Sequence, residues 1–243
     1  RGEKMLIGEI TMSDFKKGVN GSSVLIVPFG TVEAHGTHLP LDTDTLIIRE
    51  VVSKVAGKKP GVFMAPPIQY GVCTSTGPHS GTIGISASTL RHIASDIVKS
   101  SYAQGFRNIM LVSGHGGSIH VSALKEIAEE LVTRLEGLKM AAFSIYDIIG
   151  KEAGEIAETK NDSHAGELET SLVLHLAPHL VKGRSKEEYP DFPRPLILKD
   201  KLKYWPGAVW GDPGKATAEK GERLFNVMVS KLEEVALRLE RTK

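Results

Sequence analysis

A single cysteine, Cys73, occurs in the 243 residues of the chain. One thiol cannot form a disulfide within the chain, and it cannot supply the cysteine-rich ligand set of a structural zinc site. The cysteine content is therefore consistent with a reducing compartment, and we expect a cytoplasmic protein. The nine histidines point instead to chemistry based on imidazole.

The chain also has almost no excess charge. Thirty Lys and Arg residues against 29 Asp and Glu residues give a formal net charge of +1. This balance offers no electrostatic basis for binding nucleic acid or an acidic membrane surface. No apolar run approaches the length that spans a bilayer, and the N-terminal residues contain no signal-peptide core. We therefore expect no nucleic-acid partner and no membrane association.

Apolar segments of two kinds alternate along the chain. Short β-branched runs are expected to form buried strands within residues 22–30, 61–71, 107–117 and 139–148. Longer segments predict helices at residues 43–57, 86–106, 118–136, 164–178 and 217–243. This alternation, with strands apolar on both faces, is typical of a parallel sheet covered by helices on both sides. We expect an α/β fold in which residues 1–243 form a single domain.

Residues 31–45, TVEAHGTHLPLDTDT, collect carboxylates and imidazoles directly after the first expected strand. Glu33 and His35 are two positions apart, so in extended backbone both side chains point the same way. Asp44 follows a turn that can fold the chain back, and His115 follows the third expected strand between glycines. In parallel sheets, ligands bind beyond the carboxyl ends of the strands. Carboxylates and imidazoles together suit Zn²⁺, Mn²⁺ or Fe²⁺, and a carboxylate can bridge two ions.

Structural roles account for other polar side chains of these segments. We expect Asp42 to act as a turn or cap residue and His38 to anchor its loop by hydrogen bonding. Thr43 or Asp44 is expected to cap the helix of residues 43–57, and Glu167 could equally be a first-turn carboxylate favoured by the helix dipole. Ser86 or Ser88 is expected to cap the next helix. Four histidines in or at the ends of helices are also interpreted as structural: His92, His120, His175 and His179.

Four motifs occur in a fixed order along the chain: GTVEAHGTHLPLDTD (residues 30–44), SGHGGS (113–118), HAGELETS (164–171) and GDPGKATAEKG (211–221). In this order they resemble the motifs of the creatininase, or creatinine amidohydrolase, family. GPHSGTIGIS (77–86) also resembles a segment of that family, and the similarity spans roughly residues 20–225. The resemblance implies a three-layer α/β/α sandwich with a mostly parallel sheet, and a ring-like homo-oligomer that is often a hexamer.

The resemblance also implies two divalent metal ions per chain, Zn, Mn or Fe. By this likeness Glu33 and His35 each bind one ion, Asp44 bridges them, and His115 completes the first site. His164, which matches the family's His-Ala-Gly motif, is implied to be catalytic by stabilising an oxyanion or by moving a proton to the leaving nitrogen.

The second ion needs a further carboxylate. In creatininase proper this ligand is a Glu two residues after the His matched by His115, but here that position is Gly117. We expect Glu169 to replace it, with Glu167 as the alternative.

The implied activity is metal-dependent hydrolysis of a non-peptide or cyclic C–N amide bond in a small-molecule substrate. A formamide deformylase acting on a formylamino-pyrimidine ribotide is an alternative, and the family also includes a peptidase of mycofactocin maturation. A non-catalytic oligomeric protein with a relic metal site is the alternative of another class. Creatinine is expected to be a poor substrate, because creatininase proper carries Trp residues in a region where this chain has none. Trp205 and Trp210 lie further on, in a loop that either packs internally or contacts substrate.

Overall fold

The computed structural model describes residues 4–242 and is built around a five-stranded parallel sheet. The strand order is β1-β3-β2-β4-β5, and every neighbouring pair is parallel. The strands are β1 (Met5–Leu6), β2 (Val24–Phe29), β3 (Val62–Met64), β4 (Asn108–Ser113) and β5 (Lys139–Ser144). The four predicted strands are therefore present. The edge strand β1 was not predicted, because two residues are too few to produce a hydrophobic pattern.

Seven α-helices are formed by the described residues: α1 (Met12–Gly18), α2 (Thr43–Lys58), α3 (Ala87–Ala103), α4 (Ser118–Arg134), α5 (Gly150–Ile156), α6 (Glu167–Leu176) and α7 (Ala218–Arg241). The five predicted helices correspond to α2, α3, α4, α6 and α7, although Lys243 of the last prediction lies outside the described residues. Neither α1 nor α5 was predicted, since each has only seven residues. Three short 3₁₀ helices are η1 (Ile145–Ile148), η2 (Pro178–Leu180) and η3 (Pro213–Lys215).

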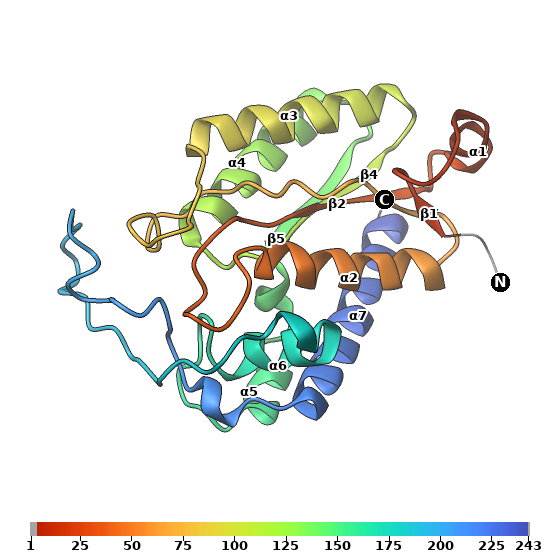
Figure 1. Ribbon diagram of the computed structural model, residues 1–243. Coiled ribbons are helices and arrows are strands. Elements are labelled where there is room, and N and C mark those ends of the chain that lie inside the picture. Colours follow the sequence, from red (N-terminus) through yellow and green to blue (C-terminus); the bar gives the residue numbers. More distant parts are fainter. Residues whose placement is uncertain (1–3, 243) are drawn as a thin grey trace.

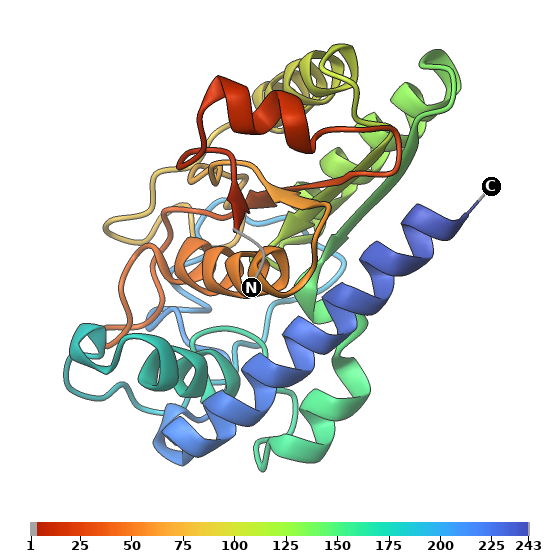
Figure 2. The same ribbon diagram turned by 90° about the vertical axis from the view of Figure 1, so that its right-hand side faces the viewer.

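The sheet is covered on both faces, as the alternation of side chains along β2 requires. Val24 and Ile26 pack into a core with residues of α2 and α7, whereas Leu25 and Val27 pack into a second core with residues of α3 and α4. Figure 1 shows α3 and α4 on one side of the sheet and α2 and α7 on the other. Figure 2 shows α1 beside the α3 layer and α7 running along the opposite layer. The predicted three-layer α/β/α sandwich is confirmed.

The residues that begin α2 and α3 can be compared with the predicted helix caps. The cap position of α2 is occupied by Asp42, which confirms the expectation that it is a turn or cap residue, although its side chain makes no capping hydrogen bond. The prediction of Thr43 or Asp44 as the cap was wrong. The cap of α3 is Ser86, whose side chain accepts a hydrogen bond from the backbone N–H of Thr89. None of the helices in residues 4–242 is both long and apolar enough to cross a membrane.

Strand register determines where the polar loops meet. Phe29, the last residue of β2, pairs with Ser113 of β4, which in turn pairs with Ser144 of β5. The loops that follow these three strands therefore leave the sheet at the same edge. The predicted strand of residues 139–148 is shorter than expected, because Ser144 and Asp147 form a capping box that turns the chain into η1.

Candidate metal centre

Glu33 and His35 lie in the loop after β2, and both are buried. The Nδ1–H of His35 donates a hydrogen bond to the backbone oxygen of Glu33 at 3.0 Å. This bond fixes the ring orientation and directs Nε2 at the neighbouring carboxylates, which is the arrangement that metal-binding histidines usually have. Nε2 lies 3.3 Å from Oδ1 of Asp44 and 3.7 Å from Oε2 of Glu169.

Asp44 lies in the first turn of α2 and is 1% exposed. While Oδ1 faces His35, Oδ2 lies 3.1 Å from Nδ1 of His115 and accepts a hydrogen bond from the hydroxyl of Thr31. Burial alone would raise the pKa of Asp44, but the two neighbouring imidazoles lower this pKa well below its usual value. The carboxylate is thus held ionised between two histidines that come from different loops.

His115 follows β4 in the glycine-rich turn. Its backbone is held by Ser113, whose hydroxyl accepts from the N–H of His115 at 3.0 Å and donates to its carbonyl at 2.8 Å. The ring nitrogen Nδ1 also lies 3.4 Å from Oε2 of Glu33. A β-carbon on residue 117 would overlap this imidazole, so Gly117 leaves the space that the ring occupies.

His164 approaches the same point from the loop before α6. Its Nε2–H donates to the backbone oxygen of Ala34 at 2.8 Å, and Nδ1 lies 3.5 Å from Oε1 of Glu33. The ring stacks on His35 with centroids 4.2 Å apart and an interplanar angle of 28°. Burial, reinforced by His35, lowers the pKa of His164 well below its usual value.

Glu169 enters from the first turn of α6 and is buried. Its Oε2 accepts a hydrogen bond from the backbone N–H of Ala165 at 2.6 Å. Ala165 has φ 48°, a left-handed conformation that non-glycine residues rarely adopt, and it carries this N–H toward the carboxylate. Burial raises the pKa of Glu169 to about 7.

Glu167 points elsewhere. Its carboxylate accepts hydrogen bonds from the backbone N–H groups of Glu158 and Thr159, and it pairs with Lys220 of α7 at 2.7 Å. The structure therefore brings Glu169, and not Glu167, into the cluster. Whether Glu169 binds a metal stays a prediction.

The remaining predicted structural residues have other partners. His38 contacts the hydroxyls of Ser185 and Thr170, each at 2.8 Å, so it anchors its loop as expected. His120 accepts at Nδ1 from the N–H of Val72, and its ring meets His115 edge-on at 5.3 Å. The other three lie in or beside helices: His92 is exposed on α3, His175 packs on Phe225, and His179 lies in η2.

Three groups of donor atoms result, each with its atoms within 4.8 Å of one another: Glu33, Asp44 and His115; His35, Asp44 and Glu169; and Glu33, His35 and His164. Oε2 of Glu33 and Nε2 of His35 are buried without a hydrogen-bond partner among the described residues. Leaving such atoms unpaired costs about 1–3 kcal/mol each. A divalent cation would remove that cost, so the donor set fits the metals expected from the sequence.

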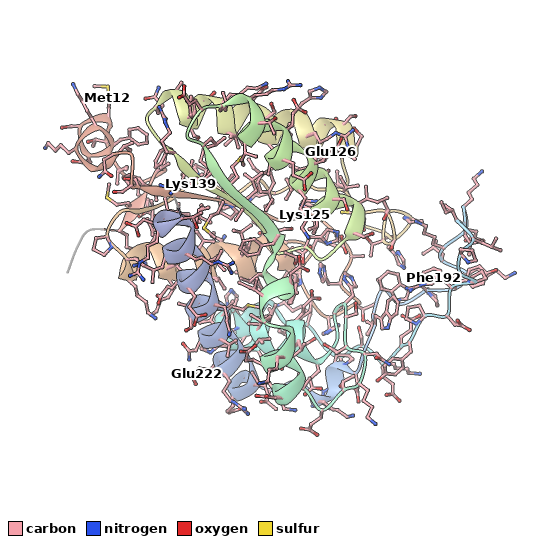
Figure 3. All side chains as sticks on the ribbon, turned by 180° about the vertical axis from the view of Figure 1, so that it is seen from behind. Met12, Lys125, Glu126, Lys139, Phe192 and Glu222 are labelled. Carbon is pink, nitrogen blue, oxygen red and sulfur yellow. The ribbon has the colours of Figure 1, made fainter. Side chains whose placement is uncertain are left out.

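A cavity of about 660 Å³ opens above these groups. Glu33, His115, His164 and Glu169 border it, together with Trp205 and Trp210. Trp205 is 3% exposed, donates its Nε1–H to the carbonyl of Val209 at 2.6 Å, and meets His164 edge-on at 5.2 Å. Trp205 therefore packs its own loop and also forms part of the cavity wall. The same loop includes Phe192, which is labelled in Figure 3 and whose ring meets Trp205 edge-on with centroids 6.2 Å apart.

Two contributors to the site were not predicted from the sequence. Tyr146 borders the cavity from η1, and Thr31 donates to Asp44. A tyrosine after a strand carries no signal of its own, whereas Thr31 stands inside the first motif and could have been found there.

Carboxylates and imidazoles gathered beneath a cavity, at the carboxyl edge of a parallel α/β/α sandwich, are the arrangement expected of a metal-dependent α/β enzyme. The sequence pattern of the family described as "Creatininase: Creatinine amidohydrolase" matches residues 8–236. The chain belongs to this creatininase family of amidohydrolases, which confirms the resemblance seen in its motifs.

Individual relatives agree with this assignment. The mycofactocin precursor peptide peptidase of Mycobacterium ulcerans (strain Agy99) is 32% identical over 237 residues, covering 92% of this chain and 88% of the relative. The creatinine amidohydrolase of Pseudomonas putida is 26% identical over 246 residues, covering 93% and 94%. The crystal structure of a creatinine amidohydrolase (creatininase) superposes with a TM-score of 0.87 at 25% identity, and the match covers 100% of both chains.

Proposed function

We propose that the chain hydrolyses an amide C–N bond with two divalent ions held by Glu33, His35, Asp44, His115 and Glu169. The observation that carries the proposal is the position of Asp44, whose two oxygens face two different histidines at 3.3 and 3.1 Å. A shared carboxylate of this kind suits a bridge between two ions. Carboxylate and imidazole donors accept several first-row metals. Solved creatininases of this fold are described as Zn–Zn and Mn forms, so zinc and manganese are the first ions to test.

When bound, the two ions would make a nucleophilic water available at neutral pH and polarise the amide carbonyl. The protein's own contribution to proton transfer is His164. Because its Nε2–H is bonded to Ala34, the ring cannot turn, and Nδ1 stays directed toward Glu33 and the cavity. We assign to Nδ1 the acceptance of a proton from the attacking water and its transfer to the leaving nitrogen as the C–N bond breaks. Trp205 supports the ring of His164 from its edge and excludes water on that side.

A peptide amide is a second candidate substrate beside the non-peptide or cyclic amide expected from the sequence. Four relatives with 30–32% identity are mycofactocin precursor peptide peptidases. A cavity of about 660 Å³ also exceeds what a single five-membered ring needs, and it lies within the range of sites for larger ligands. Both observations support a substrate that is longer than creatinine.

The proposal is tested by removing metal with a chelator, reloading the protein with Zn²⁺ or Mn²⁺, and assaying creatinine, formamides and short peptides. We expect about two ions per chain and turnover of at least one amide only in the reloaded protein. Asp44→Asn, which keeps the side-chain size, serves as the inactive control. Full metal binding without turnover of any amide would instead support the relic metal site.

A further inference from the structure

The hydroxyl of Tyr146 is buried and makes no hydrogen bond with any of the described residues. Tyr146 lies in η1 directly after β5, and its ring packs against the core shared by α2 and α7 while bordering the cavity. Buried hydroxyl groups in folded proteins nearly always have a partner, so an orphaned one needs an explanation. Because Tyr146 borders the cavity, we look for a hydrogen-bond partner that reaches its final position when a ligand or metal binds there.

The orientation of Tyr146 is fixed by its neighbours. The hydroxyl of Ser144 accepts from the backbone N–H of Tyr146 at 3.4 Å, and Asp147 accepts from the N–H of Ser144 at 3.3 Å. Lys125 of α4 lies 3.5 Å from Asp147 and ties this turn to the opposite layer. These contacts fix the backbone of the turn that carries Tyr146 at the edge of the sheet.

Glu169 is the acceptor that the geometry offers. It borders the same cavity, and its Oε2 is engaged by the N–H of Ala165 and faces His35, whereas Oε1 takes part in neither contact. The carboxylates of Glu169 and Asp44 both lie near the hydroxyl of Tyr146. A phenol, with its usual pKa of 10.0, keeps its proton at neutral pH and can act as a donor to such a carboxylate.

We propose that Tyr146 is a positioning residue whose hydroxyl donates a hydrogen bond to Glu169 in the metal-loaded protein and holds that carboxylate on the second ion. The inference rests on the dinuclear site proposed above. The chain needs such support because Gly117 offers no carboxylate, so the second ion depends on a side chain carried by α6. Ala165 fixes only one oxygen of that side chain, and Tyr146 fixes the other.

The test is a calorimetric titration of metal-free protein with Mn²⁺, comparing wild type with Tyr146→Phe, which removes only the hydroxyl. Loss of a hydrogen bond to a metal ligand typically weakens metal binding by about 10–100-fold. We expect that loss for the second ion alone, with the first ion bound as in wild type. Tyr102→Phe is the matched control, because its hydroxyl donates to the carbonyl of Glu136 far from the cavity.

A double-mutant cycle separates positioning from general destabilisation. In the Glu169→Gln background, Tyr146→Phe should add no further loss of the second ion. Wild-type affinity for both ions in Tyr146→Phe, or equal weakening of both, overturns the inference and leaves the dinuclear site standing. Unchanged metal binding with a large loss of turnover also overturns it, since the hydroxyl would then act on substrate. Wild-type protein that binds only one ion contradicts the dinuclear site itself, and this inference with it.

Discussion

The imidazole of His115 occupies the space that a β-carbon on residue 117 would need. The backbone of Gly117, with φ −59° and ψ 123°, is open to any residue, so glycine is not required there for conformational reasons. It is required because the ring of His115 lies against it. In this chain the packing leaves no room for a side chain at residue 117, so the carboxylate that we propose for the second ion, Glu169, comes from α6 instead.

Gly117→Ala should therefore displace His115 without straining the backbone. We expect metal binding at the group of Glu33, Asp44 and His115 to weaken by roughly 10–100-fold, measured by calorimetric titration of metal-free protein. Gly116→Ala is the matched control, because a β-carbon on Gly116 meets no atom within 4 Å. Unchanged metal affinity in Gly117→Ala would contradict a ligand role for His115 in its present orientation.

Asp44→Ala should lose both ions, since each of its oxygens faces a different histidine. His35→Ala should mainly lose one ion, because Nε2 of His35 contacts the group that contains Glu169 and not the group that contains His115. Elemental analysis of purified variants gives the comparison, and circular dichroism confirms that each variant folds. Full metal content in Asp44→Ala would rule out the bridging role.

Glu169→Gln should selectively weaken one ion by roughly 10-fold or more, since a neutral amide is a poorer ligand than a carboxylate for a hard cation. Glu167→Gln should leave both ions in place, because that side chain is bound to Lys220 and to backbone N–H groups. Titration with Mn²⁺ distinguishes the two variants. The reverse result would make Glu167 the ligand and would require a rearrangement of the start of α6.

Glu167→Gln should instead lower the free energy of unfolding. Burial would raise the pKa of Glu167, but Lys220 and the N–H of Thr159 outweigh it and lower this pKa below the usual 4.5. A lowered pKa contributes stability above pH 4.5 that is lost as the pH falls through the folded-state value. We expect a loss of about 1–3 kcal/mol at pH 7, shrinking below about pH 4.5. Thermal denaturation of wild type and Glu167→Gln, at pH 7 and below about pH 4.5, measures this difference in stability.

Glu158→Gln is the control for that experiment. Glu158 also pairs with Lys220, at 2.6 Å, but its side chain is 66% exposed. Exposed ion pairs contribute little, so the change should be below about 1 kcal/mol. A stability loss as large as that of Glu167→Gln would show that Lys220, and not the buried carboxylate, dominates.

Much of the fold could be predicted because most strands and helices show their hydrophobic pattern within a short stretch of sequence. The apolar run of β2 alternates between two cores, and this is visible as a continuous hydrophobic segment. The edge strand β1 and helices α1 and α5 have too few residues to show a period, so the sequence carries no comparable signal for them.

The site residues likewise fall into those that local sequence predicts and those that depend on tertiary packing. Glu33 and His35 could be paired by their spacing, and His115 and His164 by their motifs. The choice of Glu169 over Glu167 depends on how α6 is oriented against α7, which is a matter of tertiary packing. The places of Tyr146 and Trp205 in the cavity wall depend on paths of η1 and of a long loop that no local pattern encodes. The homo-oligomer stays a prediction.

Creatinine should be turned over far less efficiently than a longer amide. The sequence-based reason was the missing Trp of creatininase proper, and the structure modifies it, because Trp205 and Trp210 line the cavity from another loop. An aromatic wall is therefore present, but Trp205 is hydrogen-bonded to the carbonyl of Val209 and already packs on His164. Its position is fixed by the protein and not by the ligand. A small ring in a cavity of about 660 Å³ can contact only part of the wall, so its amide is poorly aligned with the nucleophile.

The corresponding measurement is steady-state kinetics on Zn²⁺- and Mn²⁺-loaded protein with creatinine and with short peptides. We expect kcat/KM for creatinine at least about 100-fold below that of the best peptide, equivalent to the loss of roughly 2.7 kcal/mol of transition-state stabilisation. Trp205→Leu should lower turnover of the peptide, because it removes both the wall and the support of His164. Trp210→Leu should lower turnover less, because the ring of Trp210 packs on Trp205. Creatinine hydrolysis with kcat/KM near about 10⁴ M⁻¹s⁻¹ or higher would mean that the cavity closes on small rings in a way that its present dimensions do not indicate.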